Sequence, residues 1–345
     1  MITGLVSKLI ALLLWAYAAG LALYVGLRLA IGDGYWLLSF ANNFALYYFL
    51  PLAVTLPVAL AMRRRVLSGV LAAFTVLAAG WFGPRFVPGN SVVANNADAP
   101  AITVVTFNVF GDNLTVREAV DWLLTTNADV IMLQETPSQI YFREYDDLNA
   151  AYPHQLAAHP WGDTILSRHP LETEVIYDMA DDGLASDVRA TLLLGGQTIS
   201  IYNVHMSIPL GPQQRFPAPP ENPGIYMLSR YDDTQRNRQI DALLNVLADE
   251  TRPYIVAGDF NMGDNTVTYG ELSAVMTDTQ REAGVGFGHT WPVLGARRFP
   301  EVLPTVLRID YIWHSGDFIT TDIYRGPYLG SDHLPVVATL SLSSD

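Results

Sequence analysis

The chain has 345 residues, half of them hydrophobic, with 20 basic against 34 acidic residues and no cysteine. The net charge of −14 disfavours tight nucleic-acid binding, because that function needs a basic surface to displace counterions from the phosphate backbone. The absence of cysteine sets no limit on the compartment, since a domain of this size can bury its core without disulfides.

Three apolar stretches fill the first quarter of the chain. They cover residues 9–27, 35–61 and 66–82, and each is close to the ~20 residues that a helix needs to cross a bilayer. A cleaved signal peptide would explain one such stretch and not three. Two asparagines and two prolines in the second stretch predict a kink or a late start. We therefore predict a three-helix transmembrane anchor over residues 1–83.

The basic residues of the short loops predict the orientation of this anchor. Arg63, Arg64 and Arg65 lie between the second and third stretches, and such clusters mark cytoplasmic loops. The N-terminus with Lys8 is then also cytoplasmic. We expect a multi-pass protein of the cell membrane whose chain emerges on the outer face after the third helix.

A Pro, Asn and Ala mixture at 84–100 predicts a linker, and 101–345 is expected to form one domain. Residues 98–345 carry 33 acidic and 14 basic residues, about −19 in net charge, and all 14 bases are arginine. This charge again disfavours nucleic acid as a partner, although a bound metal ion could override it locally.

Short apolar runs alternate with helical patterns throughout this domain. A helix is predicted over 229–249, where Ile240, Leu243, Leu244 and Leu247 recur at helical spacing. Strands are predicted at 102–107, 130–133, 164–166, 188–194, 198–204, 254–257, 309–313 and 334–340. The alternation predicts an α/β fold in which helices cover sheets.

Polar side chains recur where these strands begin or end. The clearest case is Gly258-Asp259-Phe260-Asn261, which follows a short apolar strand and is matched downstream by Ser331-Asp332-His333. Such groups cost free energy when they are buried singly, so their recurrence predicts one shared polar site. Carboxylates and amides side by side suit a phosphate ester held next to a metal ion. The residues concerned are Asn108, Glu135, His205, Asp259, Asn261, Asp310, Asp332 and His333.

Seven motifs in sequence resemble the series found in the endonuclease/exonuclease/phosphatase superfamily, whose fold is DNase I-like. The resemblance covers 101–342 and implies a four-layer α/β/β/α sandwich, a divalent cation and hydrolysis without a covalent intermediate. The motifs are Asn108, Leu133-Gln134-Glu135, Gly162-Asp163-Thr164-Ile165-Leu166-Ser167-Arg168, Asn203-Val204-His205, Gly258-Asp259-Phe260-Asn261, Arg308-Ile309-Asp310-Tyr311 and Ser331-Asp332-His333.

The resemblance assigns a metal site to three of these residues. Glu135 would be the main ligand, with Asn108 and Asp332 nearby. An all-oxygen set suits magnesium, or manganese as the alternative, better than zinc.

The resemblance also implies roles for the other five residues. Asp259 and Asn261 would orient the attacking water, with Asp259 as the candidate general base. His333 would contact the phosphoryl oxygens while Asp310 holds its ring, and His205 would act from the opposite side of the phosphate. The group that protonates the leaving oxygen stays unassigned.

The residue at position 205 narrows the choice of branch within the superfamily. The abasic-site nuclease branch usually carries a tyrosine at the place of His205, so the chain is closer to the secreted nuclease, sphingomyelinase and phosphatase branches. A Pro-rich segment at 207–228 is either a substrate lid or a loop packed on the domain.

The leading hypothesis is a membrane-tethered, outward-facing phosphohydrolase. Its partners would be the bilayer and a phosphorylated lipid or small phosphoester. The layout is similar to that of bacterial antibiotic-resistance phosphatases of polyprenyl pyrophosphates. A surface nuclease for extracellular DNA or RNA is the alternative, and a catalytically inactive binding module is a remote third.

Overall fold

The computed structural model describes residues 2–87, 89, 101–111, 113, 115–136, 145–158, 162–179, 187–211, 223–293 and 304–343. The chain divides into two compact units. The first is Met1–Val87 with Asn265–Val267, and the second is Pro88–Asp264 with Thr268–Asp345. Of the predicted linker, 84–87 and 89 are described, and Gly83–Phe86 forms the 3-10 turn η1.

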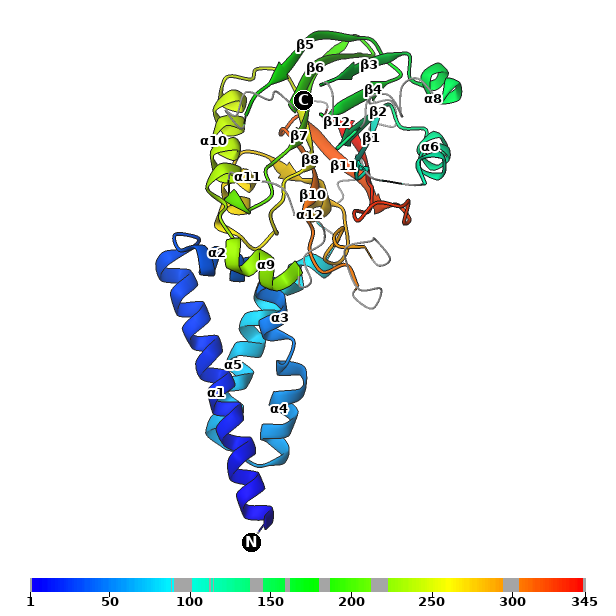
Figure 1. The fold of residues 1–345 in the computed structure, drawn as a ribbon. Helices are drawn as coiled ribbons and strands as arrows, with labels where there is room; N and C mark the ends of the chain where they lie inside the picture. The colour runs from blue at the N-terminus through cyan, green and yellow to red at the C-terminus, as the bar shows by residue number, and fades with distance from the viewer. Residues whose placement is uncertain are drawn as a thin grey trace. The chain divides into compact units, whose positions relative to one another are not determined.

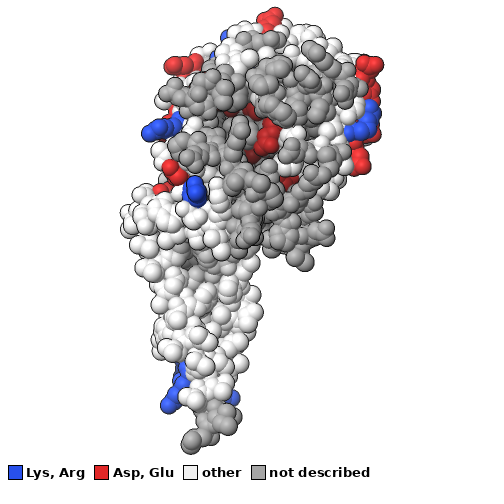
Figure 2. All heavy atoms as spheres, viewed as in Figure 1, with Lys and Arg blue, Asp and Glu red and all other residues white. Residues whose placement is uncertain are grey.

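The first unit contains two helices that are long and apolar enough to cross a membrane, α1 (Ile2–Ile31) and α5 (Arg65–Phe82). The middle stretch is broken into α2 (Trp36–Asn43), α3 (Ala45–Phe49) and α4 (Leu52–Ala61). The two parts on either side of Phe44 are bent by 75°, so a third span exists only if both cross as one. Figure 2 shows a long surface without charged side chains on this unit, as a helix in lipid requires.

The kink predicted from the asparagines has a physical cause. The Asn43 side chain donates to the C=O of Ser39 at 2.9 Å, and Asn42 donates to the C=O of Gly32 at 3.3 Å. Both asparagines are buried within the unit. The Asn43 bond lies within α2, and the Asn42 bond joins α2 to the segment directly after α1. Both polar side chains thus have partners where the helix breaks at Phe44 inside an apolar stretch.

The second unit is built on two six-stranded sheets (Figure 1). Each sheet has a central parallel pair, β1–β2 in the first and β7–β8 in the second, flanked by antiparallel neighbours. The first sheet runs β11 (Phe318–Arg325), β12 (Val336–Leu342), β1 (Ala101–Asn108), β2 (Val130–Gln134), β4 (Thr164–Ser167), β3 (His154–Ala157). The second runs β5 (Leu171–Tyr177), β6 (Asp187–Leu194), β7 (Gln197–His205), β8 (Tyr254–Asp259), β10 (Asp310–His314), β9 (Thr277–Asp278).

The sheets pack face to face, and helices cover their outer faces. Strands of both sheets contribute to one apolar cluster, for example Val104 and Ile255. A second cluster joins α6 (Val116–Thr125) and α8 (Asp146–Ala151) to the first sheet, and a third joins α10 (Thr234–Ala248) and α11 (Val267–Ser273) to the second. Short helices α9 (Pro223–Arg230) and α12 (Thr279–Glu282) complete the described elements. The predicted α/β sheet sandwich is confirmed.

The helix predicted over 229–249 is divided in the structure. The α9 helix ends at Arg230 and α10 begins at Thr234. The Asp232 carboxylate accepts from the N–H of Thr234 at 3.0 Å, which favours a turn before the helix. Asp232 and Asp233 therefore precede the first turn of α10.

A buried side-chain amide joins the two sheets next to the site. Asn203 of β7 donates to the C=O groups of Leu133 and Thr164, both at 2.9 Å, and its Oδ1 accepts from Gln134 Nε2 at 2.6 Å. We expect Asn203→Ala to lower the free energy of unfolding by about 2–4 kcal/mol, because the partners stay buried and lose their hydrogen bonds. Urea unfolding measures this, with the exposed Asn245→Ala as the matched control. Equal free energies of unfolding for the two variants would contradict a stabilising role of the Asn203 hydrogen bonds between the sheets.

Candidate active site

The carboxyl ends of the two parallel pairs meet at one edge of the sandwich. They carry Asn108 and Glu135 from the first sheet, and His205 and Asp259 from the second. The close approach of β8 to β7 explains the glycine before Asp259. Gly258 has φ +153°, and a Cβ there would lie 1.8 Å from the Val204 oxygen. No larger residue fits this position without moving the strand that holds His205.

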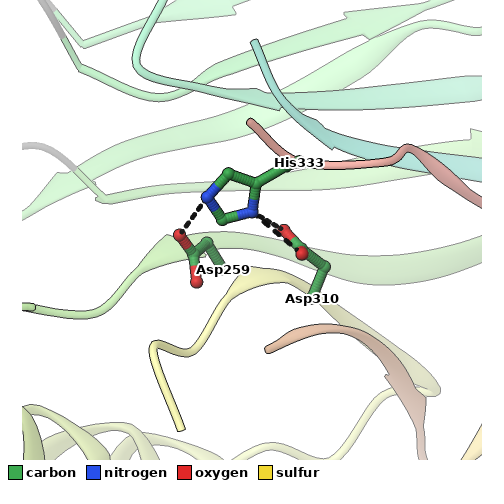
Figure 3. A group of neighbouring side chains, drawn as sticks. All are labelled: Asp259, Asp310 and His333. Atoms are coloured by element: carbon green, nitrogen blue, oxygen red, sulfur yellow. Dashed lines mark hydrogen bonds and ion pairs between the residues drawn. The ribbon is translucent and has the colours of Figure 1, made fainter. Parts of the chain in front are cut away.

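Asp310, His333 and Asp259 form a buried chain of interactions (Figure 3). Nδ1 of His333 lies 3.1 and 3.0 Å from the two oxygens of Asp310, and its Nε2 lies 3.7 Å from Oδ2 of Asp259. Burial lowers the pKa of His333, but the charges of Asp310 and Asp259 outweigh it and raise the pKa to about 10. The ring is therefore a cation at neutral pH.

Asp259 sits at the centre of the site and is almost fully buried. Its Oδ1 accepts from the N–H of Asn261 at 2.9 Å, and its Oδ2 from Asn108 Nδ2 at 3.1 Å. Burial raises the pKa of Asp259 to about 6, although the nearby His333 and His205 oppose this rise. A carboxylate with such a pKa is a suitable proton acceptor near neutral pH.

Glu135 is the most accessible carboxylate of the group, with its side chain 34% exposed. Oε1 accepts from Asn108 Nδ2 at 3.2 Å, and Oε2 from the N–H of Gly111 at 3.3 Å. Burial alone would raise the pKa of Glu135, but the charges of His205 and His333 and these hydrogen bonds hold it below its ordinary value. An ionised carboxylate open to solvent fits a hard divalent cation.

Asn108 and Asp332, the other two predicted metal ligands, direct different groups toward the site. Asn108 directs its amide nitrogen to Glu135 and Asp259, while its oxygen accepts from the N–H of Phe110 at 3.1 Å. Asn108 thus positions carboxylates as a donor in this structure. Asp332 presents Oδ2 to Trp291 Nε1 at 3.3 Å, and its Oδ1 lies 4.0 Å from His333 Nε2. The group Asp259, Asp310 and His333, with ligand atoms all within 4.8 Å, could itself hold a metal ion.

His205 and Asn261 complete the site. Nε2 of His205 lies 3.9 Å from Glu135 Oε1 and 3.8 Å from Asp259 Oδ2. The Asn261 side chain donates to the C=O of Met206 at 2.9 Å. Asn261 and Glu135 have φ of 48° and 54°, a conformation that non-glycine residues rarely adopt and that concentrates at functional sites. The structure thus brings all eight predicted residues to one site.

Three further side chains belong to this site and had no predicted role. The Ser331 hydroxyl donates to the C=O of Asn108 at 2.7 Å and accepts from the N–H of His333 at 3.0 Å, so it joins β1 to the His333 turn. Asp187 accepts from the N–H of His205 at 2.9 Å. Asp163, which directly precedes β4, is fully buried. Figure 2 shows acidic atoms inside a hollow on one face of this unit.

The predicted lid is described only in part, since 212–222 lie outside the described residues. Its last part forms α9, where the Ile225 side chain is 65% exposed. The lid stays a prediction.

The sequence profile of the Endonuclease/Exonuclease/phosphatase family matches residues 105–333. No curated protein sequence matches the chain significantly.

Three solved structures have the fold of the second unit. A family protein from Bacteroides vulgatus has 17% identity and a TM-score of 0.54, and the match covers 71% of this chain and all of that one. Humanised TDP2 of D. rerio, with 14 mutations, has 16% identity and a TM-score of 0.53, over 70% of this chain and 99% of that one. A Leptotrichia buccalis family protein has 18% identity and a TM-score of 0.51, over 70% of this chain and all of that one. The chain belongs to the Endonuclease/Exonuclease/phosphatase family.

Proposed function

We propose that this protein is a membrane-tethered, extracytoplasmic hydrolase that uses a divalent cation to cleave a phosphoester or pyrophosphate bond. The observation that carries the chemistry is the Asp310–His333–Asp259 chain beside the accessible Glu135. It places a buried cation, a proton acceptor and an ionised carboxylate around one point. These are the groups that phosphoryl transfer to water requires.

Glu135 and Asp332 are the residues that would hold magnesium or manganese, and the ion would neutralise developing negative charge on the phosphate. Asp259 accepts a proton from water as the water oxygen attacks phosphorus. The charged His333 donates from Nε2 to a phosphoryl oxygen, and Asp310 keeps its Nδ1 side occupied. His205 faces the same carboxylates from the β7 side and is the candidate donor for the leaving oxygen.

The orientation proposal rests on the basic residues at the start of α5. Arg63 and Arg64 precede this helix and Arg65 begins it, so α5 starts on the cytoplasmic side and its far end leads outward. The chain must also return from the end of α1 to Arg63. The 17 residues of 45–61 span about 25 Å as a helix, close to the thickness of the hydrocarbon core. We propose that this segment, together with α2 on the other side of the bend, forms the third span.

Tethering favours a substrate that is itself in the membrane, because both then diffuse in the same plane. A phosphorylated lipid fits this arrangement, and polyprenyl pyrophosphates are the first candidates. Extracellular DNA or RNA is the alternative substrate. It is disfavoured by the charge of about −19 over residues 98–345.

The direct test offers four substrates in parallel to the full-length protein in detergent with magnesium. They are polyprenyl pyrophosphate, sphingomyelin, a phosphoinositide and plasmid DNA, and His333→Ala serves as the blank. Phosphate or headgroup release that is absent from the variant supports the lipid proposal and identifies the lipid. Nicked plasmid with inert lipids overturns it in favour of the nuclease. No turnover of any substrate favours the inactive binding module.

Orientation is tested separately by thiol labelling, since the chain has no native cysteine. Asn245→Cys places one thiol on the exposed face of α10. An impermeant maleimide is expected to label intact cells. Labelling only after lysis would place the domain inside the cell.

A further inference from the structure

A short segment that follows the proposed base in the chain belongs to the first unit. Asn265–Val267 form one compact unit with Met1–Val87, whereas their neighbours on both sides in the chain belong to the second unit. Asp259 lies only six positions before the first residue of this segment. The proposed hydrolysis gives the segment no task, so its membership of the first unit needs a physical reason.

A buried arginine after α5 holds the start of this segment within the first unit. Arg85 belongs to η1, and its Nη2 donates to Asn265 Oδ1 at 2.8 Å. Both residues are buried. The same guanidinium donates from Nη1 to the C=O of Trp81 at 2.8 Å and lies over the ring of Phe82. These contacts with α5 fix the direction in which Arg85 presents its second nitrogen to Asn265.

A carboxylate after α1 holds the end of the same segment. The N–H of Val267 donates to Oδ2 of Asp33 at 2.5 Å, and the Asn42 side chain donates to the other oxygen of that carboxylate. The side chain of Val267 also lies against Gly32, where a Cβ would be 2.9 Å from Val267 Cγ2. The segment 265–267 is thus held by residues that directly follow α1 and α5, the two helices long enough to cross a membrane.

The chain between Asp259 and this segment is held by the second unit. The carboxylate of Asp264 pairs with Arg281 and Arg308, and the C=O of Met262 accepts from the Tyr311 hydroxyl at 3.0 Å. The chain that leaves the site therefore has fixed contacts before it enters the first unit. A displacement of 265–267 would act on a short, already restrained piece of backbone.

Asn261 is the residue expected to respond to such a displacement. Its φ of 48° is one that non-glycine residues rarely adopt, and such conformations persist only where the surrounding structure holds them. Its N–H donates to Oδ1 of Asp259 at 2.9 Å. If Asn265 is released, the backbone can relax toward an ordinary φ at Asn261, and this N–H then turns away from the carboxylate.

We propose that Arg85 and Asp33 are positioning residues of the active site, which hold Asn265–Val267 and thereby keep Asp259 and Asn261 in their catalytic geometry. The first unit then contributes to turnover as well as to tethering. The proposal rests on the hydrolysis proposed above, because it assigns these contacts a task in that reaction.

Turnover by the full-length protein in detergent is the first test. Arg85→Met keeps an apolar stem over Phe82 and removes both hydrogen bonds of the guanidinium. We expect kcat to fall by about 10- to 100-fold at an unchanged KM, because small displacements of catalytic groups have effects of this size. Arg85→Lys keeps a donor and should recover part of the loss. The matched control is Tyr17→Phe, which removes a hydrogen bond to the C=O of Tyr48 in the first unit and should keep full activity.

The acceptor side of the same contact gives an independent variant. Asn265→Ala should lower kcat by a similar factor, and the double variant with Arg85→Met should lose no more than either single variant. Asn265→Asp keeps an acceptor for Arg85 and should retain activity. Asn265→Ala also replaces Arg85→Met if that variant does not fold. Losses that multiply in the double variant would overturn the proposed contact.

Hydrogen exchange gives a readout that needs no substrate. We expect the amides of 259–264 to exchange faster in Arg85→Met than in the unmodified protein, and to stay unchanged in Tyr17→Phe. Faster exchange confined to 265–267 would overturn the proposal, and so would full kcat in Arg85→Met. If the unmodified protein hydrolyses no substrate, the hydrolase proposal fails alone, and the exchange of 259–264 still decides whether the first unit orders this segment.

Discussion

Replacing His333 by glutamine is expected to lower kcat by about 100- to 1,000-fold. The charged ring is the buried donor that faces the site, and removing one such donor from the position of developing charge typically costs 10²- to 10³-fold. The loss of its charge also leaves Asp259 and Asp310 facing each other without a cation between them. Initial rates on the substrate that the four-substrate assay identifies, at saturating concentration, measure the effect. His169→Gln is the matched control, since His169 pairs with Asp129 away from the site.

The pH dependence of activity tests whether His333 acts through its positive charge or only through the shape of its side chain. Asp310 raises the pKa of His333, which reaches about 10, so activity should persist to about pH 10 and fall above it. Asp310→Asn removes that support and lowers the pKa, so the alkaline limb should move to lower pH while activity near pH 6 is largely kept. An alkaline limb that stays in place would show that the charge on His333 is not required.

Replacing Asp259 by asparagine is the second large effect, with kcat expected to fall by about 10²- to 10⁴-fold. Asparagine keeps the shape and can still accept the hydrogen bond from the N–H of Asn261, but it cannot accept a proton. The unmodified enzyme should lose activity as the pH falls through about 6, since Asp259 then becomes protonated. Activity of the variant within tenfold of the unmodified enzyme would exclude Asp259 as the base.

Asp259→Asn is expected to lower activity but not the stability of the folded protein. Its pKa in the folded state lies above its ordinary value, so the folded form binds the proton more tightly. This group therefore costs stability as the pH rises from about 4 through 6, and Asp259→Asn removes that cost. We expect the variant to be at least as stable as the unmodified protein at pH 8, measured by thermal unfolding in chelator. A large loss of stability would mean that the loss of activity reflects misfolding.

Much of the fold could be predicted from local patterns of apolar residues in the sequence. Apolar runs such as 102–107 and 254–257 became central strands because both of their faces are buried between a sheet and a helix layer. The middle membrane stretch was harder to predict. Hydropathy measures how apolar a segment is, but it does not show that the buried Asn43 side chain bonds within α2 and that Asn42 bonds to the segment after α1.

The site residues were predictable where they follow a strand. Asn108 and Asp259 are the last residues of β1 and β8, and Glu135 follows β2 directly, so the parallel pairs bring them to one edge. Asp187 was missed because it begins β6, which runs antiparallel to β7. The first residue of an antiparallel strand lies at the same edge of the sheet as the last residue of its neighbour. Which strands are neighbours is known only from the strand order in the folded sheet. Asp163 had no predicted role, because only the tertiary fold shows that its carboxylate is buried without a hydrogen-bond partner among the described residues.

The position of β12 in the first sheet bears on how the protein is made. This strand pairs with β1, and Thr106 of β1 lies opposite Val336 of β12 although the two residues are far apart in the sequence. Asp332 and His333 immediately precede β12, so the first sheet and this part of the site are completed only when a strand far along the chain has paired with β1. Long-range pairing of this kind is slow and leaves β1 with an open edge until its partner arrives. A chain truncated before β12 would therefore lack the Asp332–His333 turn and expose the edge of β1, which makes it prone to aggregate.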